Sequence, residues 1–221
     1  DDFNGRQQKG FGRFQVTQKN GQRWSAARAF LDPARGRNNL HIITDVQVTK
    51  VILNDGRVVG VETRNGDGSV SIINASKEVV LSGGAINSPQ LLMLSGIGKK
   101  EHLSEFGIDC LHHSPEVGEN LQDHLDMTVM IKDRSRQSIG MSPFFIPRLI
   151  GAFYQYFRHR RGFLASNAAE AGAFVNLFSE TDRPEAQLHF LPAFLRDHGR
   201  KLTPGFGCTI HVCQLRPKSR G

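Results

Sequence analysis

The stretch that decides the fold runs from Gly84 to Gly98 and reads GAINSPQLLMLSGIG. The apolar run Glu78–Leu81 just before it predicts a short buried strand. The next three residues, Ser82–Gly84, predict a tight turn, because glycine tolerates backbone angles that other residues avoid. Ser88 and Pro89 are typical of the N-cap and first position of a helix, which the following leucines extend. The predicted unit is therefore strand, glycine turn and helix, an arrangement that lets backbone atoms approach the ribose or phosphate of a cofactor.

The same string resembles, position for position, a signature of the glucose–methanol–choline (GMC) oxidoreductases: Gly-Ala, two residues, Ser-Pro, an aliphatic pair, then Ser-Gly-Ile-Gly. The segments Thr17–Ala27 and Ser114–His124 are also similar to elements of this family, although Glu116 stands where the family usually has glycine. On these motifs the chain is identified as a GMC flavoprotein. The branch that it resembles most contains choline dehydrogenase and related alcohol dehydrogenases.

The resemblance covers nearly the whole chain and implies a fold of class α/β with α+β. Residues 1–126 would be part of a Rossmann-like FAD-binding domain that contains a β-meander, without its N-terminal GxGxxG unit. Residues 127–221 would be part of a substrate-binding domain with an antiparallel sheet, without the C-terminal segment that carries the family's catalytic histidine. We therefore expect an internal fragment of a complete enzyme.

Alternation of apolar residues supports the meander independently of the family. Val46–Leu53 alternates with period two, Asn54-Asp55-Gly56 predicts a hairpin turn, and Val58–Thr63 and Val70–Ile73 predict the returning strands. Elsewhere the sequence predicts further strands and helices. The strands are 40–43, 187–191 and 209–212; the helices are 25–31 (ended by Pro33 and Gly36), 99–106 and an amphipathic one at 147–157.

The resemblance implies FAD as the cofactor and assigns residues to its site. Val48 would contact the adenine through its backbone, and Ser82, Gly83 and Gly84 would form the turn beside the cofactor. The alternative for Val48 is an ordinary core position in a strand. The chain presents no metal-ligand spacing, and we name no catalytic residue within it.

Glu170, in the segment Ser166–Val175, lies where choline-oxidising members of the family carry a glutamate that faces the quaternary ammonium group. A carboxylate among apolar neighbours would hold a cation with little competition from water. The alternative is a glutamate on a solvent-exposed face or in a salt bridge. The adjacent pair Asp123 and His124 is expected to form a structural hydrogen bond, and His189 and His211 to be ordinary strand residues.

The formal net charge of +7 permits a nucleic-acid partner, but the basic residues are scattered apart from Arg158–Arg161. We therefore expect no nucleic-acid binding. This cluster follows the amphipathic segment 147–157, which suggests peripheral association with an anionic membrane, and packing within the protein is the alternative. The expected location is the cytoplasm, with peripheral contact to the inner membrane.

The function implied is FAD-dependent oxidation of a primary alcohol, choline or a similar one, to the aldehyde by hydride transfer to the flavin. The electron acceptor, a quinone or oxygen, is not specified by the sequence. The alternative is a non-catalytic remnant of a GMC flavoprotein, which the missing GxGxxG unit and the missing catalytic histidine favour.

Overall fold

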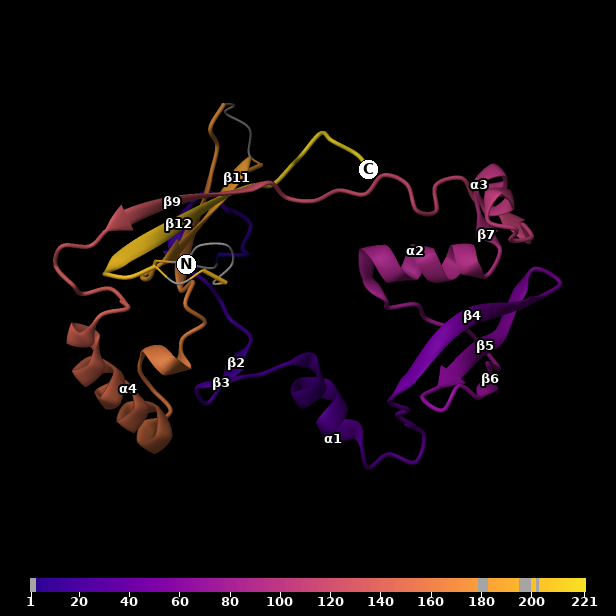
Figure 1. Cartoon of the computed structure of the whole chain (residues 1–221), viewed down its shortest axis with the longest axis horizontal. Coiled ribbons are helices and arrows are strands. Elements are labelled where there is room, and N and C mark those ends of the chain that lie inside the picture. Colours follow the sequence, from indigo (N-terminus) through magenta and orange to yellow (C-terminus); the bar gives the residue numbers. More distant parts are fainter. Residues whose placement is uncertain (1–2, 179–182, 195–199, 202) are drawn as a thin grey trace. The chain divides into compact units, whose positions relative to one another are not determined.

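The computed structural model describes residues 3–178, 183–194, 200–201 and 203–221. The chain forms two compact units (Figure 1): residues 1–37 with 123–217, and residues 38–122 with 218–221. The chain passes from one unit to the other between residues 122 and 123, close to the expected domain boundary between residues 126 and 127. The N-terminal 37 residues, however, group with the later segment, because strand β1 (Gly10–Arg13) pairs with β10 (Ala171–Val175). The assignment of a cofactor-binding and a substrate-binding domain stays a prediction.

The unit of residues 38–122 contains the predicted meander. Its strands are β4 (Val46–Asn54), β5 (Arg57–Asn65) and β6 (Val70–Asn74), paired antiparallel in that order. Asp55 and Gly56 both have positive φ, 48° and 75°, as a type I′ hairpin turn requires. Period-two alternation and the turn chemistry together thus predicted this sheet correctly.

Helix α2 spans Gly84–Leu94 and begins earlier than predicted. Ser88 is not the N-cap residue that the sequence predicted, because it lies in the second turn of α2. From there its Oγ accepts a hydrogen bond from the N–H of Gly83 at 3.0 Å. Pro89 consequently lies inside the helix. Pro89 is the sixth residue of α2, beyond the four N–H groups that lack an intrahelical partner, so the helix is without one hydrogen bond, the one that position 89 would donate to the C=O of Ala85.

The predicted strands Glu78–Leu81 and 40–43 are wrong. Both segments are irregular, and the side chains of Val80 and Ile43 are 76% and 63% exposed. An apolar run becomes a strand only where another segment offers hydrogen bonds along its length. Among the described residues, none pairs with either segment.

The same unit continues with a short parallel pair and a helix. These elements are β7 (Ile97–Gly98), α3 (Lys100–Glu105) and β8 (His112–His113). α3 agrees with the predicted helix and is followed by Gly107 at φ 67°. Leu103 of α3 and Val51 of β4 are almost completely buried, as are the polar Thr63 and Ser95, and they form the core.

The other unit is built on a five-stranded antiparallel sheet in the order β1-β10-β11-β12-β9. Its remaining strands are β9 (Asp126–Lys132), β11 (Ala186–Leu191) and β12 (Gly207–Gln214). The rings of Phe3 and Phe14 lie 4.7 Å apart, and the ring of Phe3 lies 4.8 Å from that of Phe174 of β10. These contacts attach the N-terminal segment to the sheet. The antiparallel sheet and the meander confirm the mixed fold class.

The described part of this unit also contains five helical segments, two of which are the short 3-10 helices η2 (Pro143–Phe145) and η3 (Phe163–Ala165). Ala27–Leu31 is a π-helical turn (η1) that continues directly into α1 (Asp32–Ala34), so Pro33 lies in the first turn of α1 and does not end the helix as predicted. Proline is compatible with a first helical turn because the N–H that it lacks has no partner there. The amphipathic prediction is confirmed by α4 (Ile146–His159).

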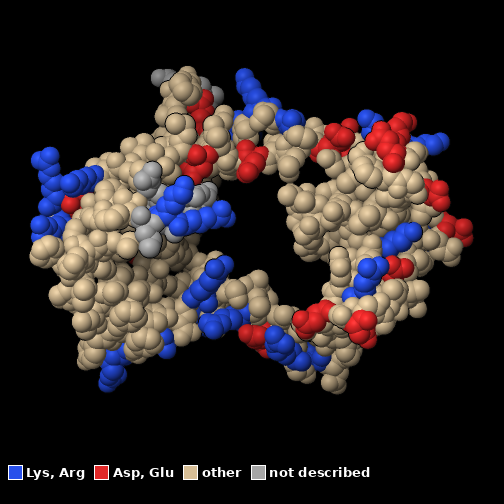
Figure 2. Space-filling model, in the orientation of Figure 1, with Lys and Arg blue, Asp and Glu red and all other residues tan. Residues whose placement is uncertain are grey.

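Charged side chains are distributed over the surface in small groups of both signs on the face that Figure 2 shows. The described helices include none that is long and apolar enough to cross a bilayer.

Candidate functional site

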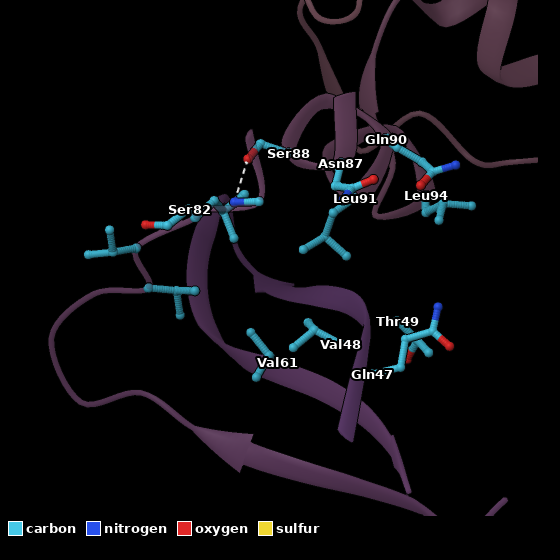
Figure 3. A pocket seen from close by; sticks show the side chains of 14 residues that line it. Gln47, Val48, Thr49, Val61, Ser82, Asn87, Ser88, Gln90, Leu91 and Leu94 are labelled. Atoms are coloured by element: carbon cyan, nitrogen blue, oxygen red, sulfur yellow. Dashed lines mark hydrogen bonds between the residues drawn. The ribbon is translucent and has the colours of Figure 1, made fainter. Parts of the chain in front are cut away.

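A cleft of about 770 Å³ lies between the meander and α2 (Figure 3). Val48 of β4 and Val61 of β5 point into it from the sheet, opposite Leu91 of α2. The side chains of Gln47, Asn87 and Gln90 supply amide groups at its edge. The residues that line this cleft include no Asp, Glu, Lys, Arg or His. It is therefore suited to a flat, uncharged ring with hydrogen-bonding edges, since apolar walls contact the faces and amides or backbone can contact the edge.

A β-bulge in β4 orients the backbone of Val48 relative to this cleft. The register pairs Val48 with Thr63, Lys50 with Glu62 and Val51 with Val61, so that Thr49 is the extra residue. The N–H of Val51 points off the free edge of the sheet, where it donates to Ser95 Oγ at 2.8 Å. Because antiparallel pairs alternate, and Thr49 and Lys50 together oppose Glu62, the N–H and C=O of Val48 also turn to the free edge. An edge strand with such free groups can hydrogen-bond a ligand without losing sheet bonds.

The predicted glycine turn forms another wall of the cleft. Ser82 and Gly83 line it, whereas Gly84, the first helical residue at φ 85°, does not. A Cβ at Gly83 would lie 3.2 Å from both Asn87 Cβ and the backbone nitrogen of Ser88, a tight contact that glycine avoids. The structure thus brings together Val48, Ser82 and Gly83, with Gly84 adjacent in sequence. Their binding of a cofactor stays a prediction.

The residues present fit the adenosine portion of the FAD that the resemblance implies. Adenine has two apolar faces and a donor–acceptor edge, which match the valine–leucine walls and the backbone of Val48. Sequence reasoning missed the three amide residues, Gln47, Asn87 and Gln90. Asn87 and Gln90 lie three residues apart on α2, a spacing that places them on one helix face and could have identified them.

Glu170 belongs to the other unit, where it lies in a shallow pocket of about 330 Å³. The pocket is lined by Phe14 and Val16, but also by Arg13 and by polar groups of Gln18, Ser166 and Asn167. Glu170 is exposed, and its backbone C=O accepts a hydrogen bond from the N–H of Phe14 at 2.9 Å. Its surroundings are therefore more polar than the apolar setting expected for it, and its role toward substrate stays a prediction.

A pair of an acid and a histidine does occur, but not where the sequence suggested. The carboxylate of Asp123 accepts a bond from the backbone N–H of His124 at 2.8 Å. The side-chain pair is instead formed by Asp126 of β9 and His211 of β12, with Oδ2 and Nδ1 2.6 Å apart. His189 of β11 lies opposite His211 in the register, so both histidines are strand residues, as predicted. Among the described residues, no group of ligating side chains could hold a metal ion.

Comparison with known proteins identifies the family of the chain. Residues 1–126 match the family model described as GMC oxidoreductase. The chain is 53% identical to alcohol dehydrogenase [acceptor] of Pseudomonas putida over 222 residues, and 43% identical to oxygen-dependent choline dehydrogenase of Staphylococcus saprophyticus. Both alignments cover all of this chain, but only 40% of the length of the alcohol dehydrogenase and 39% of the length of the choline dehydrogenase.

Among solved structures, the chain is similar to formate oxidase of Aspergillus oryzae, a structure determined to study the modification of its FAD. The TM-score is 0.74 at 26% identity, over 84% of this chain and 37% of that one. The chain thus spans about two fifths of the length of the curated relatives it matches. With more than half of its residues matched by the family model, the chain belongs to the GMC oxidoreductase family.

Proposed function

We propose that the protein to which this chain belongs oxidises a primary alcohol to the aldehyde with FAD, and that this chain binds the adenosine end of the cofactor. Bound FAD would supply the two-electron acceptor for the alcohol. The family and the alcohol and choline dehydrogenase relatives support the reaction class. The chain's own residues support the binding role.

The observation that carries the proposal is the bulged edge strand beside the cleft. The bulge at Thr49 leaves the N–H and C=O of Val48 unused by the sheet, at the position where an adenine edge would lie. The Ser82–Gly83 turn would run along the ribose, since it has no side chain at Gly83 to exclude it. Val61 and Leu91 would contact the two faces of the ring. These contacts bind and orient; they do not transfer protons.

For the substrate we propose a primary alcohol without a positive charge, in preference to choline. Glu170 would attract a quaternary ammonium group, but Arg13 lines the same pocket and would repel it. Both groups are accessible to water, so neither interaction is strong. The higher identity to the alcohol dehydrogenase relative also supports this choice.

The binding role can be tested with two proline variants of the complete protein. Val48→Pro removes the N–H proposed to meet the cofactor without removing a sheet hydrogen bond. Val46→Pro is the matched control, because Val46, opposite Asn65, has its N–H on the same free edge and does not line the cleft. Loss of one hydrogen bond should weaken FAD binding roughly five- to tenfold in Val48→Pro only.

FAD content per polypeptide and the dissociation constant measured after deflavination are the readouts. Equal FAD affinity in both variants, with unchanged melting temperatures, would show that Val48 does not serve the cofactor. The reaction class is tested separately, by anaerobic bleaching of the flavin absorbance on addition of a primary alcohol. No bleaching by any primary alcohol would reject it.

A further inference from the structure

Helix α4 presents an apolar stripe outward from its unit. The side chains of Ile146, Ile150, Phe153 and Phe157 are 53%, 65%, 47% and 68% exposed. Their spacing of four, three and four residues places them on one line along the helix, here called the outer stripe. The rings of Phe153 and Phe157 lie parallel, 6.2 Å between centroids, so the stripe is continuous toward the C-terminal end.

A neighbouring side of α4 holds the helix in place. Leu149 and Tyr156 are half-buried and Ala152 is buried. The guanidinium of Arg148 donates to the backbone C=O groups of Arg136 and Gln137 at 2.8 Å. The helix is therefore fixed by one face, while the described residues leave a second, apolar face uncovered.

The charges on α4 and on the segments that flank it in sequence are of one sign. From residue 134 to residue 169 the sequence contains six arginines and no aspartate or glutamate. Arg158, Arg160 and Arg161 directly follow Phe157, and all three are exposed. On the face that Figure 2 shows, the region of α4 is surface without charged side chains, bordered by basic ones and with no acidic side chain over it. An outward apolar stripe with a purely basic border is unusual for a helix that faces only water.

From this combination we infer that α4 is a membrane-surface helix, which lies in the headgroup region of a bilayer that contains anionic phospholipids. The outer stripe would enter the boundary between headgroups and acyl chains, and the arginines would contact the phosphates. The helix has 14 residues, about 21 Å, enough to lie along the surface and too few to span the bilayer. Charge complementarity favours anionic lipid over a protein partner, since the border offers no acidic side chain to form mixed ion pairs.

Vesicle binding by the complete protein tests this inference. Sedimentation is compared between phosphatidylcholine vesicles and vesicles in which about 30% of the lipid is phosphatidylglycerol. We expect binding to the anionic vesicles, weakened by high salt. Replacing Phe153 and Phe157 together by serine should weaken it at least about tenfold, because two exposed rings lose their apolar environment.

Two matched controls separate the outer stripe from general surface effects. Phe30 and Phe106 are 78% and 68% exposed on other elements, so Phe30→Ser with Phe106→Ser should leave binding unchanged. Arg158→Gln with Arg161→Gln should weaken binding about 25-fold, roughly fivefold per arginine, whereas Lys99→Gln with Lys100→Gln should not.

Three results would overturn the inference. The first is no binding of the wild-type protein to anionic vesicles, as expected if another part of the protein or a partner protein covers the stripe. The second is equal binding to both vesicle types. The third is binding by the Phe153/Phe157 variant as strong as that of the wild type.

Discussion

The Oγ of Ser95 accepts a hydrogen bond from the backbone N–H of Val51 at 2.8 Å and donates one to the C=O of Leu91 at 2.6 Å. Ser95 ends α2, and Val51 lies on the free edge of β4, so one hydroxyl joins the two elements that enclose the cleft. Ser95 is fully buried. The width of the candidate adenosine site is therefore set by a serine that does not itself line the site.

Ser95→Ala should destabilise the protein by about 1–3 kcal/mol, because the buried N–H of Val51 loses its partner. Ser104→Ala is the control, since Ser104 Oγ donates to the C=O of Lys100 at 2.9 Å on an exposed helix face. Urea unfolding of the complete protein measures both, and the control should change by less than about 0.5 kcal/mol. Similar values for the two variants would contradict the role given to Ser95.

Gly96→Ala should be more destabilising than Gly107→Ala. Both glycines have positive φ, 82° and 67°, which costs an alanine about 1 kcal/mol. At Gly96 a Cβ would also lie 2.6 Å from the C=O oxygen of Asp109, whereas at Gly107 nothing lies within 4 Å. We expect about 1 kcal/mol for Gly107→Ala and about 3 kcal/mol for Gly96→Ala from thermal unfolding. Equal losses would mean that the backbone near Asp109 moves aside.

Stability should fall on mild acidification because of His189. Burial lowers the pKa of His189 below its ordinary value, the charge of Asp126 opposes this, and His211 lowers the pKa further. The folded state therefore binds a proton less readily than the unfolded state does. The contribution of His189 to the free energy of unfolding is fully present above the pKa of the unfolded state, about 6.5, and is lost as the pH falls below it.

In the His189→Gln variant, the midpoint of urea unfolding should change less between pH 7.5 and pH 5 than it does in the wild type. His41→Gln is the control, since His41 is exposed on an irregular segment. If the two variants keep the same acid sensitivity as the wild type, His189 is not its source.

Glu170→Gln tests the cation-binding role that the resemblance implies. Choline and 3,3-dimethylbutan-1-ol have the same shape and differ in charge, so they form a matched pair of substrates. If Glu170 faces the ammonium group, kcat/KM for choline should fall about tenfold more than for the neutral alcohol. Equal effects would remove this role. Arg13→Gln should shift preference toward choline, as expected if Arg13 repels cations in the same pocket.

The local sequence determined the meander, α3 and the amphipathic character of α4. Alternating apolar residues, an Asp-Gly pair that accepts positive φ, and a helical spacing of Phe153 and Phe157 are properties of a few neighbouring residues. The family, too, could be identified from the string Gly84–Gly98. What this local information specifies is which backbone angles a segment prefers and which side chains it tends to bury.

Only the tertiary structure decided the partners. Helix α2 begins at Gly84, and the Oγ of Ser88 accepts a hydrogen bond from the N–H of Gly83 instead of capping a later helix start. The segment Glu78–Leu81 has no neighbouring strand among the described residues. The tertiary structure turned the backbone of Val48 outward through the bulge at Thr49, and it paired Asp126 with His211, 85 residues away. The physical reason is that hydrogen-bond register and long-range pairing depend on where other segments lie, and no short window of sequence contains that information.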